Sequence, residues 1–389
     1  MSSLETWRSD TPGCKNRIHL NNAGAALMPT AVSDAILRHI HLESEIGGYE
    51  AHEASETEIR GVYDHLARYI GAAASEIAIV ENATVAFAQA LSAFDLRSGD
   101  AIITSRADYP SNQLMYLSLA RRLGVEIRRA ADLPDGGVDP DSVRALARDG
   151  RCRVIAITWV PTNSGLIQNV EAVGAIAEEL EIPYIIDACQ SVGQIPIDVA
   201  RLKCDFLSGA ARKYLRGPRG VGFLYVSDRI AGRGAYPLYV DERGADWTGP
   251  NTYTLKSGGR RFENWEFAYA LVLGMGAAVR YASDVGDITY TRPAALAARL
   301  RTLLDGVPGV RVTDLGRHRA AIVTVAVPGH DPEAVKLALR SRGINVSVSE
   351  PQEGANDARG EYLLRLSPHY YNTDDELETA VATLQEVLS

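Results

Sequence analysis

The chain of 389 residues is 46% hydrophobic and 23% charged, with a formal net charge of −9 at pH 7. This length predicts one large and one smaller domain, and the acidic balance argues against nucleic acids or anionic membranes as partners. The four cysteines lack CxxC spacing, the N-terminus lacks an apolar signal core, and no run approaches the roughly 18 apolar residues of a membrane span. We therefore expect a cytoplasmic protein without a metal site or a disulfide framework.

Strands and helices are expected to alternate through the first two thirds of the chain. Short apolar runs rich in β-branched residues predict strands at 76–80, 101–104, 154–160, 183–186, 206–207 and 221–226. Helical patterns lie between some of them, at 81–91 and 170–180. Such alternation predicts an α/β fold in which a mostly parallel sheet lies between helices.

The last third of the chain has a different pattern. Residues 227–259 are rich in glycine and predict an extended excursion, which leads into a helix at 267–279. We expect an N-terminal segment (1–20), a large domain (21–284) and a small α+β domain (285–389). In the small domain we predict helices at 293–304 and 332–342 and strands at 310–312, 322–327, 344–348 and 362–367. No role follows for residues 43–52, where Gly47 and Gly48 interrupt a polar helical pattern.

A carboxylate and a lysine follow two of the central strands. Asp187 ends the strand at 183–186, and Lys213 lies in the loop between 206–207 and 221–226. In an open α/β sheet, polar groups at the carboxyl ends of strands face the ligand crevice. Pyridoxal phosphate needs a lysine amine for its Schiff base and a carboxylate that keeps its ring nitrogen protonated, so the pair fits this cofactor. By spacing alone, a helix-capping aspartate and one cation of a basic loop explain the pair equally well.

The residues around this pair resemble a known family. The stretches DACQ (187–190) and RKYLRGPRGVGFLYV (212–226) are similar to the class V aminotransferases, fold-type I pyridoxal phosphate enzymes. That family includes cysteine desulfurases, selenocysteine lyases, kynureninase, isopenicillin N epimerase and cysteine C–S lyases. The resemblance extends over nearly the whole chain. It implies a seven-stranded, mostly parallel sheet, a homodimer with shared active sites, and Lys213 and Asp187 as catalytic residues.

Several cofactor contacts are implied by the same resemblance. The turn at Ala83 and Thr84, which opens a helix, corresponds to the family's phosphate site, and free N–H groups at a helix start do attract anions. Simple N-capping by Asn82 or Thr84 would explain these residues as well. Tyr109 stands where desulfurases place a histidine over the cofactor ring; it can stack in the same way but is a poorer proton carrier. Further cofactor contacts are expected from Asn163, Gln190 and Arg212.

Substrate contacts are also implied by the resemblance. Arg365 matches the arginine that clamps the substrate α-carboxylate, a task suited to its bidentate fork. Asn163, Asn21 and Ala25 are expected beside it. Glu266 replaces a threonine that in relatives reaches the partner's phosphate site, and Arg212, in place of a histidine, could pair with the phosphate or with Glu266.

The reaction depends on what the pocket does with the substrate once Lys213 has removed its α-proton. Desulfuration needs a cysteine nucleophile on the loop before Arg365, and residues 342–360 contain none. We therefore expect a C–S β-lyase that converts a cysteine S-conjugate to thiol, pyruvate and ammonia in secondary metabolism, and whose activity survives cysteine alkylation. Decarboxylation with oxidative deamination, amino transfer and epimerisation stay open. A binding protein without activity would be expected to have lost Lys213 or Asp187.

Overall fold

The central sheet of the protein is seen in a computed structural model that describes residues 3–350 and 361–389. Within these residues the sheet has seven strands in the order β2-β8-β7-β6-β5-β3-β4. Their bounds are β2 (Ile77–Val80), β3 (Ala101–Thr104), β4 (Glu126–Arg129), β5 (Cys152–Thr158), β6 (Tyr184–Asp187), β7 (Phe206–Ala210) and β8 (Gly222–Val226). β8 is antiparallel to both of its neighbours, and the other pairs are parallel. The predicted α/β fold with a seven-stranded, mostly parallel sheet is confirmed.

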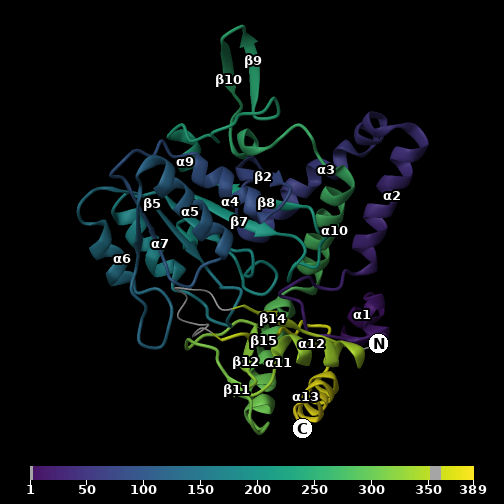
Figure 1. The fold of residues 1–389 in the computed structure, drawn as a ribbon. Coiled ribbons are helices and arrows are strands. Elements are labelled where there is room, and N and C mark those ends of the chain that lie inside the picture. Colours follow the sequence, from purple (N-terminus) through teal and green to yellow (C-terminus); the bar gives the residue numbers. More distant parts are fainter. Residues whose placement is uncertain (1–2, 351–360) are drawn as a thin grey trace.

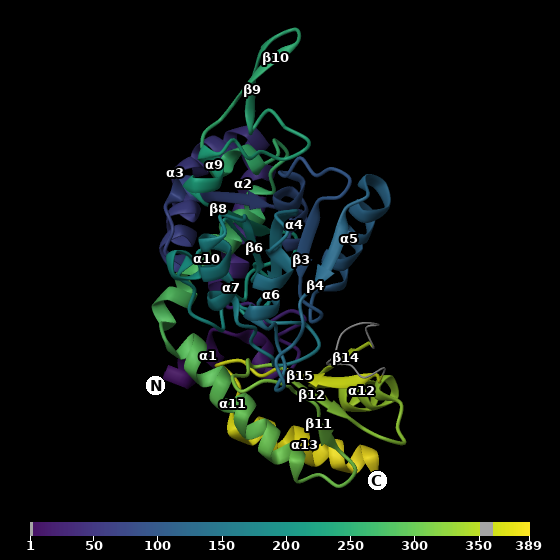
Figure 2. The ribbon, with the colours of Figure 1, turned by 90° about the vertical axis from the view of Figure 1, so that its left-hand side faces the viewer.

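Helices cover both faces of this sheet because its strands are apolar on both sides (Figures 1 and 2). Alternate residues of β2 show this: Ile77 and Ile79 belong to one buried cluster, and Ala78 and Val80 to another. The longer helices are α2 (Thr30–Ile46), α3 (Gly48–Ile70), α4 (Ala83–Ser92), α5 (Pro110–Leu123), α6 (Pro140–Ala147), α7 (Val170–Glu179) and α10 (Tyr269–Val285). Short elements are α1 (Ser3–Ser9), α8 (Val199–Leu202), α9 (Asp228–Gly232), η1 (Pro12–Lys15), η2 (Ala74–Glu76) and η3 (Gly259–Phe262). Among the described residues, no helix combines the length and apolar character that a membrane span requires.

The C-terminal part is built on a smaller antiparallel sheet. Within the described ranges its order is β11-β12-β15-β14, and a separate two-stranded pair joins β1 to β13 in parallel. The strands are β1 (Ile18–His19), β11 (Arg311–Val312), β12 (Val323–Ala326), β13 (Ile344–Asn345), β14 (Ser347–Ser349) and β15 (Leu363–Leu366). The helices are α11 (Ile288–Asp305), α12 (Pro332–Ser341) and α13 (Asp374–Leu388). The N-terminal segment is therefore tied to the C-terminal part through β1.

Two details of this part differ from the prediction. The helix expected to start at Pro293 starts at Ile288 and contains Pro293 as its sixth residue, where a proline removes one main-chain hydrogen bond and crowds the preceding turn. A proline in a helical pattern therefore does not mark the helix start here. The strand expected at 344–348 is divided into β13 and β14, which belong to different sheets. The domain limits of 1–20, 21–284 and 285–389 stay predictions; Gly286 and Asp287 separate α10 from α11 near the expected boundary.

The structure shows the conformation of two segments, 43–52 and 227–259, for which the sequence indicated no role. Residues 43–52 form the bend between α2 and α3, where Gly47 has a φ of 101° that favours glycine. The excursion at 227–259 contains a hairpin of β9 (Ala245–Gly249) and β10 (Thr252–Leu255). This hairpin stands away from the body of the molecule at the top of Figures 1 and 2.

A substitution at Gly193 can test how closely the chain packs against the loop that follows Lys213. A Cβ at Gly193 would lie 2.3 Å from the carbonyl carbon of Tyr214 and 2.4 Å from the nitrogen of Leu215, and Gly193 has a φ of 90°. Gly99 is a matched control, with a φ of 88° and open space within 4 Å of the place that a Cβ would take. We expect Gly99→Ala to lose about 1–2 kcal/mol through its backbone strain alone. Gly193→Ala should lose a further 1–3 kcal/mol or so from overpacking.

The midpoint of thermal unfolding measures the difference between these two variants. Equal losses in Gly193→Ala and Gly99→Ala would contradict the close packing.

Candidate active site

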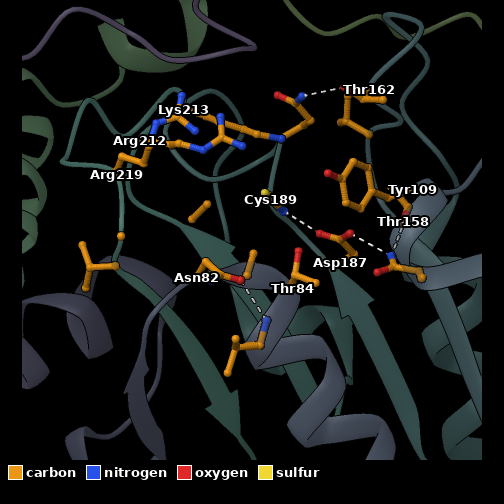
Figure 3. A pocket seen from close by; sticks show the side chains of 18 residues that line it. Asn82, Thr84, Tyr109, Thr158, Thr162, Asp187, Cys189, Arg212, Lys213 and Arg219 are labelled. Carbon is orange, nitrogen blue, oxygen red and sulfur yellow. Dashed lines mark hydrogen bonds between the residues drawn. The ribbon is translucent and has the colours of Figure 1, made fainter. Parts of the chain in front are cut away.

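A cavity of about 510 Å³ opens at the carboxyl ends of the central strands (Figure 3). Thr158, Asp187 and Ala210 end β5, β6 and β7 and line it, as the open α/β architecture predicts. Its size is that of a small-molecule site. The predicted site residues that line it are Ala83, Thr84, Tyr109, Asp187, Gln190, Arg212 and Lys213.

The Lys213 side chain lies buried in this cavity. Burial lowers the pKa of its amine, and the charge of Arg212 lowers it further, against the opposing effects of Cys189 and Asp187. Its Nζ lies 5.9 Å from the ring centroid of Tyr109. An amine that is neutral at lower pH than an ordinary lysine is suited to act as nucleophile and base.

Asp187 is held on both of its oxygens. Asn112 donates to Oδ2 at 2.9 Å, and the backbone N–H of Cys189 donates to Oδ1 at 2.9 Å. Asn112 also donates to Asp108 at 3.1 Å, so one amide fixes two buried carboxylates. Burial raises the pKa of Asp108, and the charge of Asp187 adds to that rise. Asp108 in turn accepts the N–H of Tyr109 at 2.7 Å, which fixes the start of α5 beside the cavity.

The N-terminus of α4 lines another part of the cavity through Ala83 and Thr84. The Asn82 side chain caps this helix by accepting the N–H of Val85 at 3.0 Å. The expected capping is therefore present, yet it leaves the first N–H groups, those of Ala83 and Thr84, available to an anion. Arg219 lines the same cavity. A phosphate would find both a helix N-terminus and a guanidinium here.

Cys189 lines the cavity as well, a position that sequence reasoning did not find. Burial raises the pKa of its thiol, against the lowering effect of Lys213. Because an alkyl group on Cys189 would occupy the cavity, the expectation that activity survives alkylation of all cysteines no longer follows. The clue was available, since Cys189 lies only two residues beyond the strand-end Asp187.

Four predicted residues lie outside the cavity lining: Asn21, Ala25, Asn163 and Arg365. Nη1 of Arg365 donates to Thr162 at both its carbonyl oxygen (2.9 Å) and its hydroxyl (2.8 Å), and Thr162 lines the cavity. Asn21 forms an isolated bridge with Ser367, at the end of the strand that carries Arg365. Arg365 therefore lies directly behind the part of the wall that Thr162 forms, and the roles of all four residues stay predictions.

The suggested pairing of Arg212 with Glu266 does not form within one chain. Arg212 donates to the carbonyl of Gly24 instead. Glu266 lines a smaller neighbouring cavity with Gly220 and Val221, two residues that also line the large one. Whether Glu266 meets a partner's site stays a prediction.

Sequence reasoning missed other residues of the cavity besides Cys189. Thr158 could have been found from register, because it is paired with Asp187 at the end of the neighbouring strand. Arg219 belongs to the basic cluster at 212–219, whose local concentration of charge is suited to a small anion. Two other polar residues of the lining, Asn112 and Thr162, gave no signal that would have distinguished them from ordinary helix and turn residues.

The donor set fits pyridoxal phosphate. Among the buried polar atoms that lack a hydrogen-bond partner within the described residues is Oε1 of Gln190, a residue that lines the cavity. Such atoms are costly unless a ligand satisfies them. Asp187 would hold the ring nitrogen, Lys213 the aldehyde carbon, and the α4 N-terminus with Arg219 the phosphate.

Comparisons with known proteins agree with this geometry. A "Probable cysteine desulfurase" of Methanothermobacter thermautotrophicus is 25% identical over 98% of each chain. A "Probable hercynylcysteine sulfoxide lyase" of Mycobacterium tuberculosis is 28% identical over 98% of this chain and 93% of its own. The solved structure of a cysteine desulfurase from Thermococcus onnurineus superposes with a TM-score of 0.89 and 24% identity, covering 99% of this chain and 98% of that one.

The family model of the aminotransferases of class V matches residues 18–379. The resemblance seen in the stretches around Asp187 and Lys213 is therefore confirmed, and so is pyridoxal phosphate as the cofactor of this family. The chain belongs to the class V aminotransferase family and is a pyridoxal phosphate enzyme of the cysteine desulfurase and C–S lyase kind.

Proposed function

We propose that the protein is a C–S β-lyase that converts a cysteine S-conjugate and water to a thiol, pyruvate and ammonia. The observation that supports this proposal is the set of reactive side chains that line the cavity. They are a buried Lys213 amine with a lowered pKa and one cysteine thiol, Cys189, whose pKa is raised. The relative described as a hercynylcysteine sulfoxide lyase supports carbon–sulfur cleavage.

The residues of this chain divide the work of such a cleavage. Bound pyridoxal phosphate supplies an electron sink for the substrate's α-carbon. Lys213 Nζ takes the α-proton, Asp187 keeps the ring nitrogen protonated, and Arg365 orients the α-carboxylate from behind Thr162. The thiolate can then leave from the β-carbon without covalent help from the protein.

Persulfide formation is the main competing reaction, because several relatives are described as cysteine desulfurases. It requires a thiolate nucleophile. Residues 342–360 contain no cysteine, although 351–360 lie outside the described residues. Cys189 is the alternative nucleophile, and its raised pKa disfavours the thiolate. Both facts favour elimination over desulfuration.

The first test concerns the cofactor lysine. Lys213→Ala should abolish the visible absorbance of the holoenzyme and its turnover, because the cofactor loses its covalent attachment. Lys336→Ala, on the distant helix α12, is the matched control and should retain both. An unchanged visible spectrum in Lys213→Ala would remove the basis of the proposal.

The second test concerns the electron sink. Asp187→Asn keeps the shape of the side chain but removes the charge that holds a proton on the ring nitrogen, and its one carbonyl oxygen can accept only one of the two hydrogen bonds that Asn112 and the Cys189 N–H donate. We expect it to retain cofactor and to lose turnover by about 10²-fold or more, which corresponds to roughly 2.7 kcal/mol in the barrier. Steady-state kinetics on cofactor-saturated protein measures this loss, and near-normal turnover would refute the role of Asp187.

The third test is product analysis with a panel of S-alkyl cysteine conjugates. We expect thiol and pyruvate in equal amounts, without added keto acid, and the same one-to-one ratio in Cys189→Ala. Alanine in place of pyruvate, with loss of thiol release in that variant, would instead indicate transfer of the S-alkyl group to Cys189 as a mixed disulfide.

Other products would identify the other reactions. Carbon dioxide with an S-linked aldehyde would indicate decarboxylation with oxidative deamination. A requirement for keto acid, with accumulation of pyridoxamine phosphate, would indicate an aminotransferase, and racemised substrate an epimerase. Secondary metabolism and the cytoplasm stay predictions for pathway and location.

The fourth test concerns assembly, because we also propose a homodimer with shared active sites. The excursion that precedes the 258–266 segment exposes large aromatic side chains, with Tyr239 81% and Trp247 82% exposed. Aromatic residues of this kind are enriched at protein interfaces. Sedimentation of the holoenzyme should show a dimer, and Tyr239→Asp with Trp247→Asp should weaken it; a fully active monomer would reject the proposal.

A further inference from the structure

Two arginines approach the same end of the cavity without an acidic partner. Arg212 lines the cavity, and Arg365 reaches it through Thr162. Each donates to a backbone carbonyl, and within the described parts of the chain neither pairs with a carboxylate. Nε of Arg365 is also buried without a hydrogen-bond partner.

Gln190 links the surroundings of the two arginines: its Nε2 donates to the carbonyl of Ala23, next to the Gly24 carbonyl that Arg212 contacts, and to Oγ1 of Thr162, which Arg365 contacts. Burial lowers the pKa of Arg365 to about 10, against the raising effect of Tyr214, and the charge of Arg212 lowers it further. Two like charges in a partly buried site are unfavourable unless an anion lies between or beside them. The pair is therefore suited to a ligand that presents more than one acidic group.

The orientation of Arg212 separates it from the phosphate end of the cavity. Its Nη1 donates to Gly24, and its carbonyl oxygen accepts the N–H of Ala26 at 2.9 Å, so it is held by the segment that contains Asn21. Arg219 lies next to Gly220 and Val221, and a Cβ at the following Gly222 would lie 3.0 Å from the nitrogen of Ala83 at the α4 N-terminus. Arg219 is thus the arginine of the phosphate end, and Arg212 that of the substrate end.

A count of charges alone does not assign Arg212 to the substrate end of the cavity. A phosphate dianion and one α-carboxylate carry three negative charges, which three arginines could balance. The position of Arg212 beside Arg365, on the side of residues 21–26, is what distinguishes it.

We propose that Arg212 binds a carboxylate on the S-substituent of the substrate, while Arg365 binds the α-carboxylate. The substrate class is then the cysteine S-conjugates that carry a second acidic group near the sulfur. This inference rests on the proposed lyase function for the identity of the substrate, but the recognition of two carboxylates can be measured without turnover.

The binding experiment uses two isosteric ligands, succinate and succinamate, which differ in one carboxylate. Calorimetry on the holoenzyme should show succinate binding at least about tenfold more tightly, or about 1.4 kcal/mol, since only its second carboxylate can form a charge-assisted hydrogen bond with Arg212. Arg212→Gln should reduce this ratio to within about twofold, and Arg212→Lys, which keeps the charge but not the planar fork, should retain part of it. Arg219→Gln is the matched control: it should weaken cofactor affinity and leave the ratio intact.

The turnover experiment uses S-carboxymethylcysteine and its neutral isostere S-carbamoylmethylcysteine. The wild type should prefer the former in kcat/KM, and Arg212→Gln should lose that preference. Three results would overturn the proposal: no preference for the dicarboxylate, equal weakening of succinate and succinamate in Arg212→Gln, or loss of cofactor affinity in that variant with the ratio unchanged. A preference for neutral S-oxide conjugates over the carboxylate would also overturn it.

The two hypotheses fail in different ways. If succinate binding depends on Arg212 but no conjugate is cleaved, the lyase function is wrong and the recognition of two carboxylates stands. If conjugates are cleaved without regard to the second carboxylate, the lyase function stands and the assignment of Arg212 is wrong.

Discussion

A buried arginine three residues beyond Lys213 fixes the loop on which the active site depends. The Arg216 guanidinium is 1% exposed and, among the described residues, has no carboxylate partner. It donates to Leu27 O at 2.9 Å, to the Tyr370 hydroxyl at 2.6 Å and to Thr11 Oγ1, and the rings of Tyr281, Tyr370 and Tyr371 lie with centroids 4.6–5.5 Å from it. A buried charge of this kind is tolerated only where its donors are satisfied and aromatic faces surround it. Because its partners come from both ends of the chain, the lysine loop reaches its observed shape only when both termini are in place.

Tyr214, the residue directly after Lys213, makes a second connection between this loop and the C-terminal part of the chain. Its hydroxyl donates to Ala321 O, and its ring stacks on His369 with centroids 5.4 Å apart. His369 accepts the N–H of Tyr370 at Nδ1, so its Nε2 donates to the carbonyl of Tyr214, and burial holds its pKa well below the ordinary range. A neutral histidine between aromatic rings thus joins the C-terminal part to Lys213. Arg365, the proposed carboxylate clamp, lies in strand β15 shortly before His369, so these contacts join its strand to the lysine loop.

The sequence predicted those features that depend on local patterns. The strands at 76–80 and 101–104 were found to within a residue because apolar runs end there at polar turns. The strand pattern drew attention to Asp187 and Lys213, and the family resemblance of their neighbours decided for the cofactor pair. The contact of Arg365 with Thr162, 203 residues apart, depends on tertiary packing and left no local signal. The hairpin of β9 and β10 was missed because it is largely exposed and lacks the alternation of a half-buried strand. Cys189 was missed although it lies two residues beyond the strand-end Asp187, because the search for chemistry stopped at the cofactor pair.

The competing reactions of this family share the carboxylate and the lysine, so the choice between them lies elsewhere in the cavity. Asp187 is set by the end of β6, and Lys213 by the end of β7 together with the contacts that Tyr214 and Arg216 make in the same loop. Arg212 and the 21–26 segment are set by loop docking, through the contacts of Arg212 with Gly24 and Ala26. Replacing a side chain at such a contact alters what surrounds the substrate's β-carbon and leaves the electron sink and its base intact. Substrate preference can therefore diverge between relatives while the cofactor chemistry is retained, which is why groups such as Arg212 and Cys189 carry more information about this enzyme's reaction than the cofactor pair does.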